Sequence, residues 1–263
     1  MRSFRWALAF LCLTATLASA AEPKDPLARA RFLYNDRQFD AAVVAAEEAR
    51  RAPERADSAD LIAARAYLER FRASAVPGDL TKARDRLRRI DPGRLVARER
   101  TELIIGIGET LFFDQSWGAA AGVFESVLGG GALTPGARER VLDWWASALD
   151  RDARPRSDFE RQAVYQKIRD RMQLEIDANP GSSAASYWLS AAAWGQGDHQ
   201  AAWDAAQAGW VRAPMTSDRG AALRGDLDRL VQRGIIPERA RALAQSPDTL
   251  QQEWEQFKDR WRK

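Results

Sequence analysis

The sequence predicts an all-α fold, a right-handed α-solenoid of about five helical hairpins with a C-terminal helical cap. Apolar residues recur at helical spacing along most of the 263 residues. Glycines and prolines interrupt that periodicity, and Pro180 and Pro214 lie 34 residues apart. Many apolar positions are alanine, whose small side chain lets two helix axes approach to roughly 8–10 Å. One hairpin alone cannot bury its apolar face, so stacked hairpins must share a core.

The first 21 residues have the pattern of a secretory signal peptide. Arg2 and Arg5 precede an apolar run over residues 6–17, and residues 18–20 are the small residues that a signal peptidase requires. That run is too short to span a bilayer, and no later stretch reaches the roughly 20 apolar residues of a membrane helix. We therefore expect cleavage near Ala20/Ala21 and a periplasmic or secreted product without an integral membrane segment.

Cysteine content and charge narrow the function classes further. Cys12, the only cysteine, follows Leu11 rather than a small residue, so a lipoprotein signal is not expected. Arg2 and Arg5 supply two of the three net positive charges, which leaves +1 after cleavage. Runs of mixed sign such as residues 84–89 are typical of solvated helix faces. This near-neutral charge gives no support to nucleic-acid binding.

Two hairpins are predicted near the N-terminus, over Leu27–Pro53 and Leu61–Pro92. Each combines apolar residues at helical spacing with a closing proline, although the spacing differs between them. The pattern residues are Phe32, Phe39, Ala42 and Ala49 in the first, and Gly78-Asp79, Ala83 and Leu87 in the second.

A clearer hairpin is predicted over Thr101–Leu128. Ile107-Gly108 places an apolar and a small residue in its first helix, and Trp117 follows its turn. One face of the second helix carries Ala120, Phe124 and Leu128. The glycines 129–131 that follow are interpreted as a helix terminator and connector, since no Lys-Ser/Thr completes a phosphate-binding loop.

The segment Pro135–Pro180 can hold a divergent hairpin, with a long turn at Asp150–Ser157. Its first helix carries Val141, Trp144, Trp145 and Leu149, and its second carries Val164, Ile168, Met172 and Ile176. Whether this segment is a true repeat stays open at this point.

The last hairpin is predicted over Ala185–Pro214, where Gly197-Asp198 separates two helices. The first helix carries Tyr187, Leu189, Ala192 and Ala193, and the second carries Ala202, Ala206 and Trp210. Alanines allow close helix contact here, and the larger side chains fill the space beside it.

Residues 215–263 are predicted to form the cap. Ser217 is expected to begin a helix that carries Leu223, Leu227, Leu230 and Val231. Pro237 suits the first turn of a short helix, and Ser246-Pro247-Asp248 opens a last one. That last helix carries Leu250, Trp254, Phe257 and Trp261 at spacings of four, three and four. This stripe is interpreted as covering the open end of the solenoid, with a partner-binding amphipathic helix as the alternative.

The last hairpin resembles one unit of the tetratricopeptide repeat family. The residues that carry the resemblance are Leu189, Gly197-Asp198, Ala202 and Pro214. It differs at Ser190 and Ala193, where the family usually has a small glycine and a tyrosine, whereas Gly108 supplies that glycine in the hairpin over 101–128. The resemblance implies TPR-like hairpins over residues 22–214 and a concave groove that binds a partner.

Family analogy places certain first-helix positions in that groove. They are Glu109, Phe112, Phe113, Tyr187, Ala191 and Trp194. Aromatic rings there can anchor a peptide or an apolar ligand, because a ring buries much area at small entropic cost. Packing between hairpins is the competing interpretation for each of the nine tryptophans after residue 21.

Recognisable catalytic chemistry is missing from the sequence. His199 is the only histidine, and a zinc site or a nucleophile–base pair needs more His or Cys than this. Gly106-Ile-Gly108 follows helical sequence and lacks the third glycine of a dinucleotide loop. Two of the many carboxylates can still meet as acid and base, but nothing in the sequence selects a pair. We therefore expect a protein that is not an enzyme, with no cofactor and no metal.

The sequence thus predicts an exported, non-enzymatic scaffold that binds a segment of another envelope or periplasmic protein. The alternative is a periplasmic solute-binding protein associated with a transporter, whose groove holds a small apolar or acidic ligand. An open groove favours the first interpretation, and a closed pocket of roughly 300–1,000 Å³ favours the second.

The signal-peptide hypothesis gives a direct prediction. N-terminal sequencing of the protein purified from a periplasmic extract is expected to begin next to Ala20/Ala21. Replacing Ala18 and Ala20 by bulky residues should leave the uncleaved chain. Recovery of the intact N-terminus from the wild-type protein would contradict the assignment.

Overall fold

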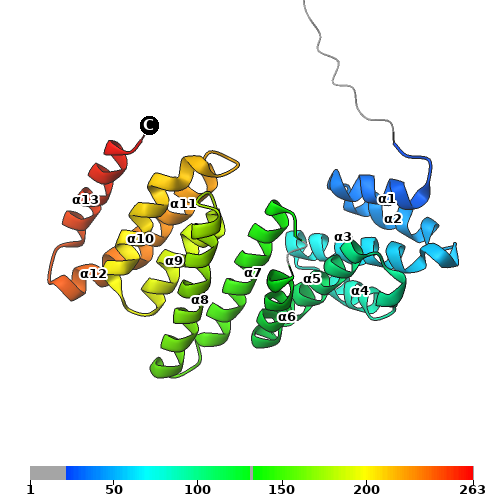
Figure 1. The fold of residues 1–263 in the computed structure, drawn as a ribbon, viewed down its shortest axis with the longest axis horizontal. Coiled ribbons are helices and arrows are strands. Elements are labelled where there is room, and N and C mark those ends of the chain that lie inside the picture. The colour runs from blue at the N-terminus through cyan, green and yellow to red at the C-terminus, as the bar shows by residue number, and fades with distance from the viewer. Residues whose placement is uncertain (1–21, 131–132, 263) are drawn as a thin grey trace, which may run out of the picture.

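The computed structural model describes residues 22–130 and 133–262, and all regular structure in these residues is helical (Figure 1). The α-helices are α1 Pro26–Asn35, α2 Phe39–Ala49, α3 Ala56–Ser74, α4 Pro77–Leu87, α5 Ala97–Phe113, α6 Trp117–Gly129, α7 Pro135–Ala153, α8 Asp158–Ala178, α9 Ser183–Gly195, α10 His199–Arg212, α11 Ala221–Leu230, α12 Ile236–Leu243 and α13 Pro247–Arg260. A π-helix, Val231–Ile235, joins α11 to α12. The predicted all-α class is confirmed. The proposed signal peptide and Gly131 lie outside the described residues.

The helices pack in a regular order along the chain. From α1 to α11, each odd-numbered helix contacts the next odd-numbered helix, and we call these six the odd-helix row. Each even-numbered helix from α2 to α10 packs against the row members before and after it. The row therefore presents one continuous helical layer, which α12 and α13 follow at the C-terminal end (Figure 1).

Apolar burial divides into two large clusters. One lies among α1–α4, and the other extends from Phe112 to Phe257. Phe113 packs against both clusters. Its ring centroid lies 4.9 Å from that of Phe71 and 5.4 Å from that of Trp144, edge to face in both pairs. Phe112 in turn lies 4.6 Å from Trp144. We call these four rings the aromatic junction, because they join the two clusters.

The middle hairpin has a shorter turn than expected. The predicted turn at Asp150–Ser157 is wrong in its first part, because α7 continues to Ala153. Ser157 then begins α8 with a capping box. Its Oγ accepts from the backbone N–H of Glu160, whose carboxylate accepts from the Ser157 N–H at 3.1 Å. Reciprocal caps of this kind fix a helix start locally.

The first helix of the predicted cap begins later than the sequence suggests. The expected helix start at Ser217 is wrong, and α11 begins at Ala221. Asp218 and Thr216 hold a turn here, since the Gly220 N–H donates to Oδ1 of Asp218 at 3.0 Å and to Oγ1 of Thr216 at 2.8 Å. Gly220 has φ +87°, a conformation that favours glycine.

The last helices agree with the predicted pattern. Pro237 lies in the first turn of α12. Leu250, Trp254 and Phe257 of α13 are buried. Trp261 lies beyond the end of α13 and stays half-exposed, so it does not extend the buried stripe.

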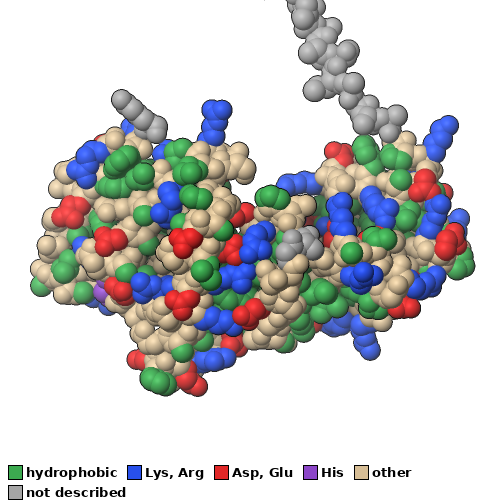
Figure 2. Space-filling model, viewed as in Figure 1, with side chains coloured by type: hydrophobic (Ala, Val, Ile, Leu, Met, Phe, Trp, Pro, Cys, Tyr) green, Lys and Arg blue, Asp and Glu red, His purple; other side chains and the backbone are tan. Residues whose placement is uncertain are grey.

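The surface is mixed in charge. Acidic and basic side chains are interspersed over the face shown in Figure 2, as the runs of mixed sign predict. Within the described residues, no helix is both long enough and apolar enough to cross a membrane.

Gly108 offers a test of the packing between α5 and α6. A Cβ at Gly108 would lie 2.6 Å from Cε1 of the fully buried Phe124, whereas a Cβ at Gly122 has nothing within 4 Å. Gly108→Val should lower the free energy of unfolding by about 1–3 kcal/mol through overpacking. The same change at Gly122 should stay within about 0.5 kcal/mol. Urea unfolding of both variants measures the difference, and equal effects would contradict this packing.

Candidate binding groove

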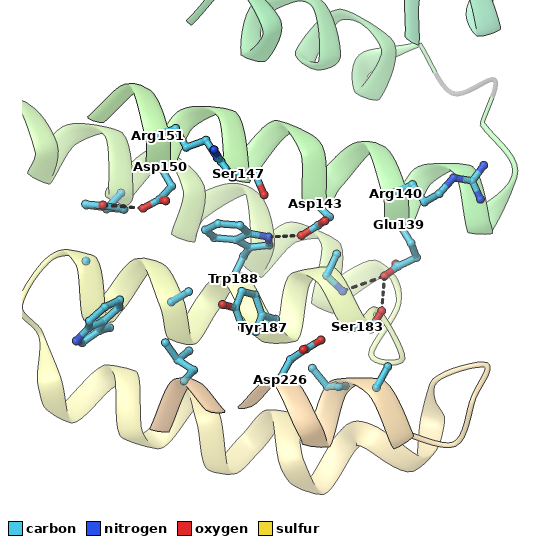
Figure 3. Close-up of a pocket in the computed structure, with 18 of the residues that line it drawn as sticks. Glu139, Arg140, Asp143, Ser147, Asp150, Arg151, Ser183, Tyr187, Trp188 and Asp226 are labelled. Carbon is cyan, nitrogen blue, oxygen red and sulfur yellow. Dashed lines mark hydrogen bonds between the residues drawn. The ribbon is translucent and has the colours of Figure 1, made fainter. Parts of the chain in front are cut away.

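A groove with a volume of about 580 Å³ lies on α7, α9 and α11 of the odd-helix row (Figure 3). Its α7 side carries Glu139, Asp143, Ser147, Asp150 and Arg154. These polar residues recur at intervals of four, four, three and four, so they share one face of the helix. Its α9 side carries Tyr187, Trp188, Ala191 and Trp194, and α11 adds Leu223 and Asp226.

Hydrogen bonds between α7 and α9 hold the groove at its width. The indole N–H of Trp188 donates to Oδ1 of Asp143 at 2.9 Å. One turn away, Oε2 of Glu139 accepts from Oγ of Ser183 at 3.1 Å and from the Ala184 N–H at 3.0 Å. The second contact satisfies a backbone donor in the first turn of α9, which a helix leaves without an internal partner. Both walls therefore have fixed positions.

The centre of the groove concentrates acidic groups. Burial raises the pKa of Asp143, and the carboxylates of Asp226 and Glu139 raise it further. Burial also raises the pKa of Tyr187, with Asp226 and Asp143 adding to the effect. Figure 3 shows the Tyr187 ring projecting into the groove toward Asp226, with Ser147 on the facing helix. Hydroxyl and carboxylate groups thus face the same open space.

The other end of the groove is closed by paired groups. The Tyr165 hydroxyl donates to Oδ1 of Asp150 at 2.9 Å, and Arg154 pairs with the same carboxylate at 2.6 Å. Burial raises the pKa of Tyr165 to about 12, and Asp150 contributes to the shift. Arg151 lies over the ring of Trp117, 4.8 Å from its centroid. Ligand contacts are therefore expected nearer the centre.

Three predicted groove residues line this groove, namely Tyr187, Ala191 and Trp194. Trp194 is also fixed to the cap, because its indole N–H donates to Oε2 of Glu238 at 2.8 Å. Its ring lies against Gly234, where a Cβ would approach it to 3.0 Å. Trp194 therefore combines a groove surface with a packing role, and its removal should also loosen α12.

The other three predicted residues lie elsewhere. Glu109 lines a second cavity, between α1, α3, α5 and α7. Phe112 is buried in the larger apolar cluster, and Phe113 is part of the aromatic junction. Neither phenylalanine lines the groove or the second cavity. The contacts of Phe112 and Phe113 therefore agree with the competing interpretation, in which these rings pack between hairpins.

The sequence analysis missed the polar groups of the groove centre. Asp143, Ser147 and Asp226 are ordinary residue types for a helix surface, so none attracts attention singly. The available signal was the regular spacing of polar residues along 139–154, on the face opposite to the buried Leu142 and Trp145. A row of polar residues on one helix face does not by itself indicate a groove, because a face exposed to solvent has the same pattern.

Side chains that bind metal ions are not clustered in residues 22–130 and 133–262. No group of three or more His, Cys, Asp or Glu side chains is placed there to hold an ion. His199 lies at the start of α10, with Nδ1 3.8 Å from Oε2 of Glu238.

Comparison with known proteins finds no matching family model, curated protein or solved structure. The resemblance to the tetratricopeptide family remains an expectation drawn from residues 101–128 and 185–214. The chemistry of the groove is the remaining basis for a functional proposal.

The tyrosines give a prediction for alkaline pH. Burial raises the pKa of all four, Tyr34, Tyr67, Tyr165 and Tyr187, above the model-compound value of about 10. The unfolded chain then loses phenolic protons at lower pH than the folded chain does. The tyrosines' contribution to the free energy of unfolding is therefore complete below about pH 10. It is lost as the pH rises through the pKa values that these tyrosines have in the folded protein.

Phenolate absorbance measured against pH tests this expectation. The folded protein should show little ionisation near pH 10, and the same titration in denaturant should show all four groups ionising there. Tyr165→Phe should remove the component that titrates last. A full-amplitude transition near pH 10, with circular dichroism unchanged, would contradict the described burial.

Proposed function

We propose that this chain is an exported, non-enzymatic scaffold of the tetratricopeptide type, a right-handed α-solenoid of about five hairpins. In this proposal, the groove on α7, α9 and α11 binds a segment of another protein of the periplasm or envelope. The observation that carries the proposal is the groove itself, a preformed concave surface on successive members of the odd-helix row.

The order of packing supports the repeat architecture. In stacked hairpins, the first helix of each unit lies beside the first helix of the next. The contacts from α1 through α11 follow this rule, and each even-numbered helix from α2 to α10 fits the role of a second helix. In this reading the divergent segment 135–180 supplies a full unit, with α7 in the row and α8 behind it.

The groove chemistry supports a peptide segment as the ligand. Tyr187 offers a ring and a hydroxyl, and Ser147 and Asp226 offer hydrogen-bonding groups along the opposite walls. Interfaces draw much of their affinity from aromatic anchors of this kind, surrounded by polar groups. The hydrogen bonds from Trp188 and Ser183 to α7 preorganise these groups, which lowers the cost of binding.

A small ligand is a second candidate for the same groove. The volume of about 580 Å³ lies within the roughly 300–1,000 Å³ typical of small-molecule sites. Under this proposal the chain is a solute-binding protein, and the acidic centre disfavours an acidic solute there.

Photo-crosslinking in the intact envelope tests the scaffold proposal. A photoreactive amino acid is placed at Tyr187, inside the groove, or at Phe159, which is 87% exposed and outside it. We expect one defined protein adduct from position 187 and none from position 159. Asp226→Asn should weaken that adduct about ten-fold or more while circular dichroism stays unchanged.

The outcome separates the two candidates. The same adducts from both positions, or none from position 187, would overturn the scaffold proposal. Native mass spectrometry of the purified chain then tests the small-ligand candidate. A retained metabolite should be present in the wild type and absent from Ser147→Trp, whose ring fills the groove.

A further inference from the structure

The second cavity, with a volume of about 500 Å³, lies over α1, α3, α5 and α7 and beside Trp144 of the aromatic junction. Its walls bring together five arginines, Arg37, Arg65, Arg72, Arg98 and Arg140. Three glutamates, Glu69, Glu102 and Glu109, share the cavity with them. The lining therefore has a formal excess of two positive charges, in a chain that is close to neutral after residue 21.

Two of the three glutamates, Glu69 and Glu102, are already in ion pairs, and Glu69 accepts from Arg72. Glu102 accepts from Arg65 at 2.7 Å and from Arg98 at 3.1 Å. The Arg65 guanidinium also lies 4.4 Å from the ring centroid of Tyr34. These contacts fix the orientation of Arg65, so a ligand that binds its remaining N–H groups costs less side-chain entropy.

Arg140 of α7 brings a further positive charge to the cavity, and the same side chain also lines the end of the groove on α7, α9 and α11. It is exposed, and no ion pair of this side chain is found among the described residues. Figure 3 shows its guanidinium directed away from Asp143 and Tyr187 of the groove. A guanidinium offers a planar fork of donors that matches the two oxygens of a carboxylate.

Glu109 is the unusual group of this cavity. It is half-buried on α5, and no hydrogen bond or ion pair of its carboxyl group is found in residues 22–130 and 133–262. Burial raises its pKa to about 7, Glu69 of α3 adds to the shift, and Arg65, Arg72 and Arg140 oppose it. A protonated Glu109 can donate a hydrogen bond, whereas an ionised one only accepts.

We propose that this cavity binds a carboxylate, held by Arg65 and Arg140 with the carboxyl group of Glu109 beside it. Tyr34, Phe39 and Trp144 provide apolar surface for the rest of the ligand. An ionised Glu109 would repel the ligand, so binding and protonation favour each other. The carboxylate comes either from a free organic acid or from an acidic side chain of a peptide.

Calorimetric titration of the full chain tests the proposal with two probes. Benzoate represents the free acid, and an acidic hexapeptide with blocked ends represents the side chains. Benzamide is the uncharged control for benzoate. We expect at least one carboxylate probe to bind about ten-fold tighter at pH 6 than at pH 8, because the protonated fraction of a group with a pKa near 7 changes by about that factor. Benzamide should not bind at either pH.

Two variants separate the proposed roles. Glu109→Gln keeps a donor at every pH, so it should retain binding and lose the pH dependence. Arg140→Gln should weaken binding about ten-fold or more. Arg89→Gln, an exposed arginine outside the cavity, is the matched control and should leave the affinity unchanged.

The probe that binds identifies the source of the carboxylate. Binding of neither probe would overturn the proposal, as would a pH dependence that persists in Glu109→Gln or an affinity unaffected by Arg140→Gln. Arg140 lines both sites, whereas Arg65 and Glu109 line the second cavity and not the groove. Failure to capture a partner at the groove therefore leaves the carboxylate proposal standing.

Discussion

Edge-to-face contact among four aromatic rings is the constraint on which the arrangement of this molecule depends. Phe113 lies between Phe71 of α3 and Trp144 of α7, and it packs against both apolar clusters. Rings in this geometry contribute about 0.5–1.5 kcal/mol per pair beyond their buried area. The direct contact of α5 with α7 is slight compared with that of α6 with α7. The rings therefore add to the packing of α4 and α6 in aligning the first part of the odd-helix row with the second.

Helix α7 has a central position, because it borders both cavities. Trp144 lines the second cavity, Asp143 and Ser147 line the groove, and Arg140 lines both. The polar residues of α7 thus line two sites that differ in electrostatic character, one rich in arginine and the other acidic at its centre, with Arg140 common to both. Electrostatic complementarity contributes mainly to specificity.

The helices were predictable to different degrees, for physical reasons. Periodicity and breakers located α9 and α10 closely, because Gly197 and Asp198 mark the turn between them. The end of α7 was not predictable from Asp150, because aspartate as a residue type favours caps and turns, whereas here it lies inside the helix. The start of α11 depends on a turn held by Thr216 and Asp218, which no helical pattern reveals.

The candidate sites were predictable only in part. Ring positions such as Tyr187 follow from the repeat pattern, whereas the charged partners of a cavity come from helices far apart in sequence. Arg65 and Arg140 illustrate the limit, because only the stacking of α3, α5 and α7 brings them to one cavity. Spacing within one helix carries no information about that convergence.

The distribution of aromatic residues gives the two clusters different optical signatures. Every tryptophan after residue 21 lies at position 117 or later, so the cluster among α1–α4 contains none. Indole fluorescence therefore monitors the C-terminal cluster and is silent about the N-terminal one, where Tyr34 and Tyr67 are the chromophores. Helical circular dichroism senses both. If Phe71 of α3 separates from Phe113 of α5 before either cluster melts, the two signals will follow different transitions, and the chain will not unfold as a two-state system.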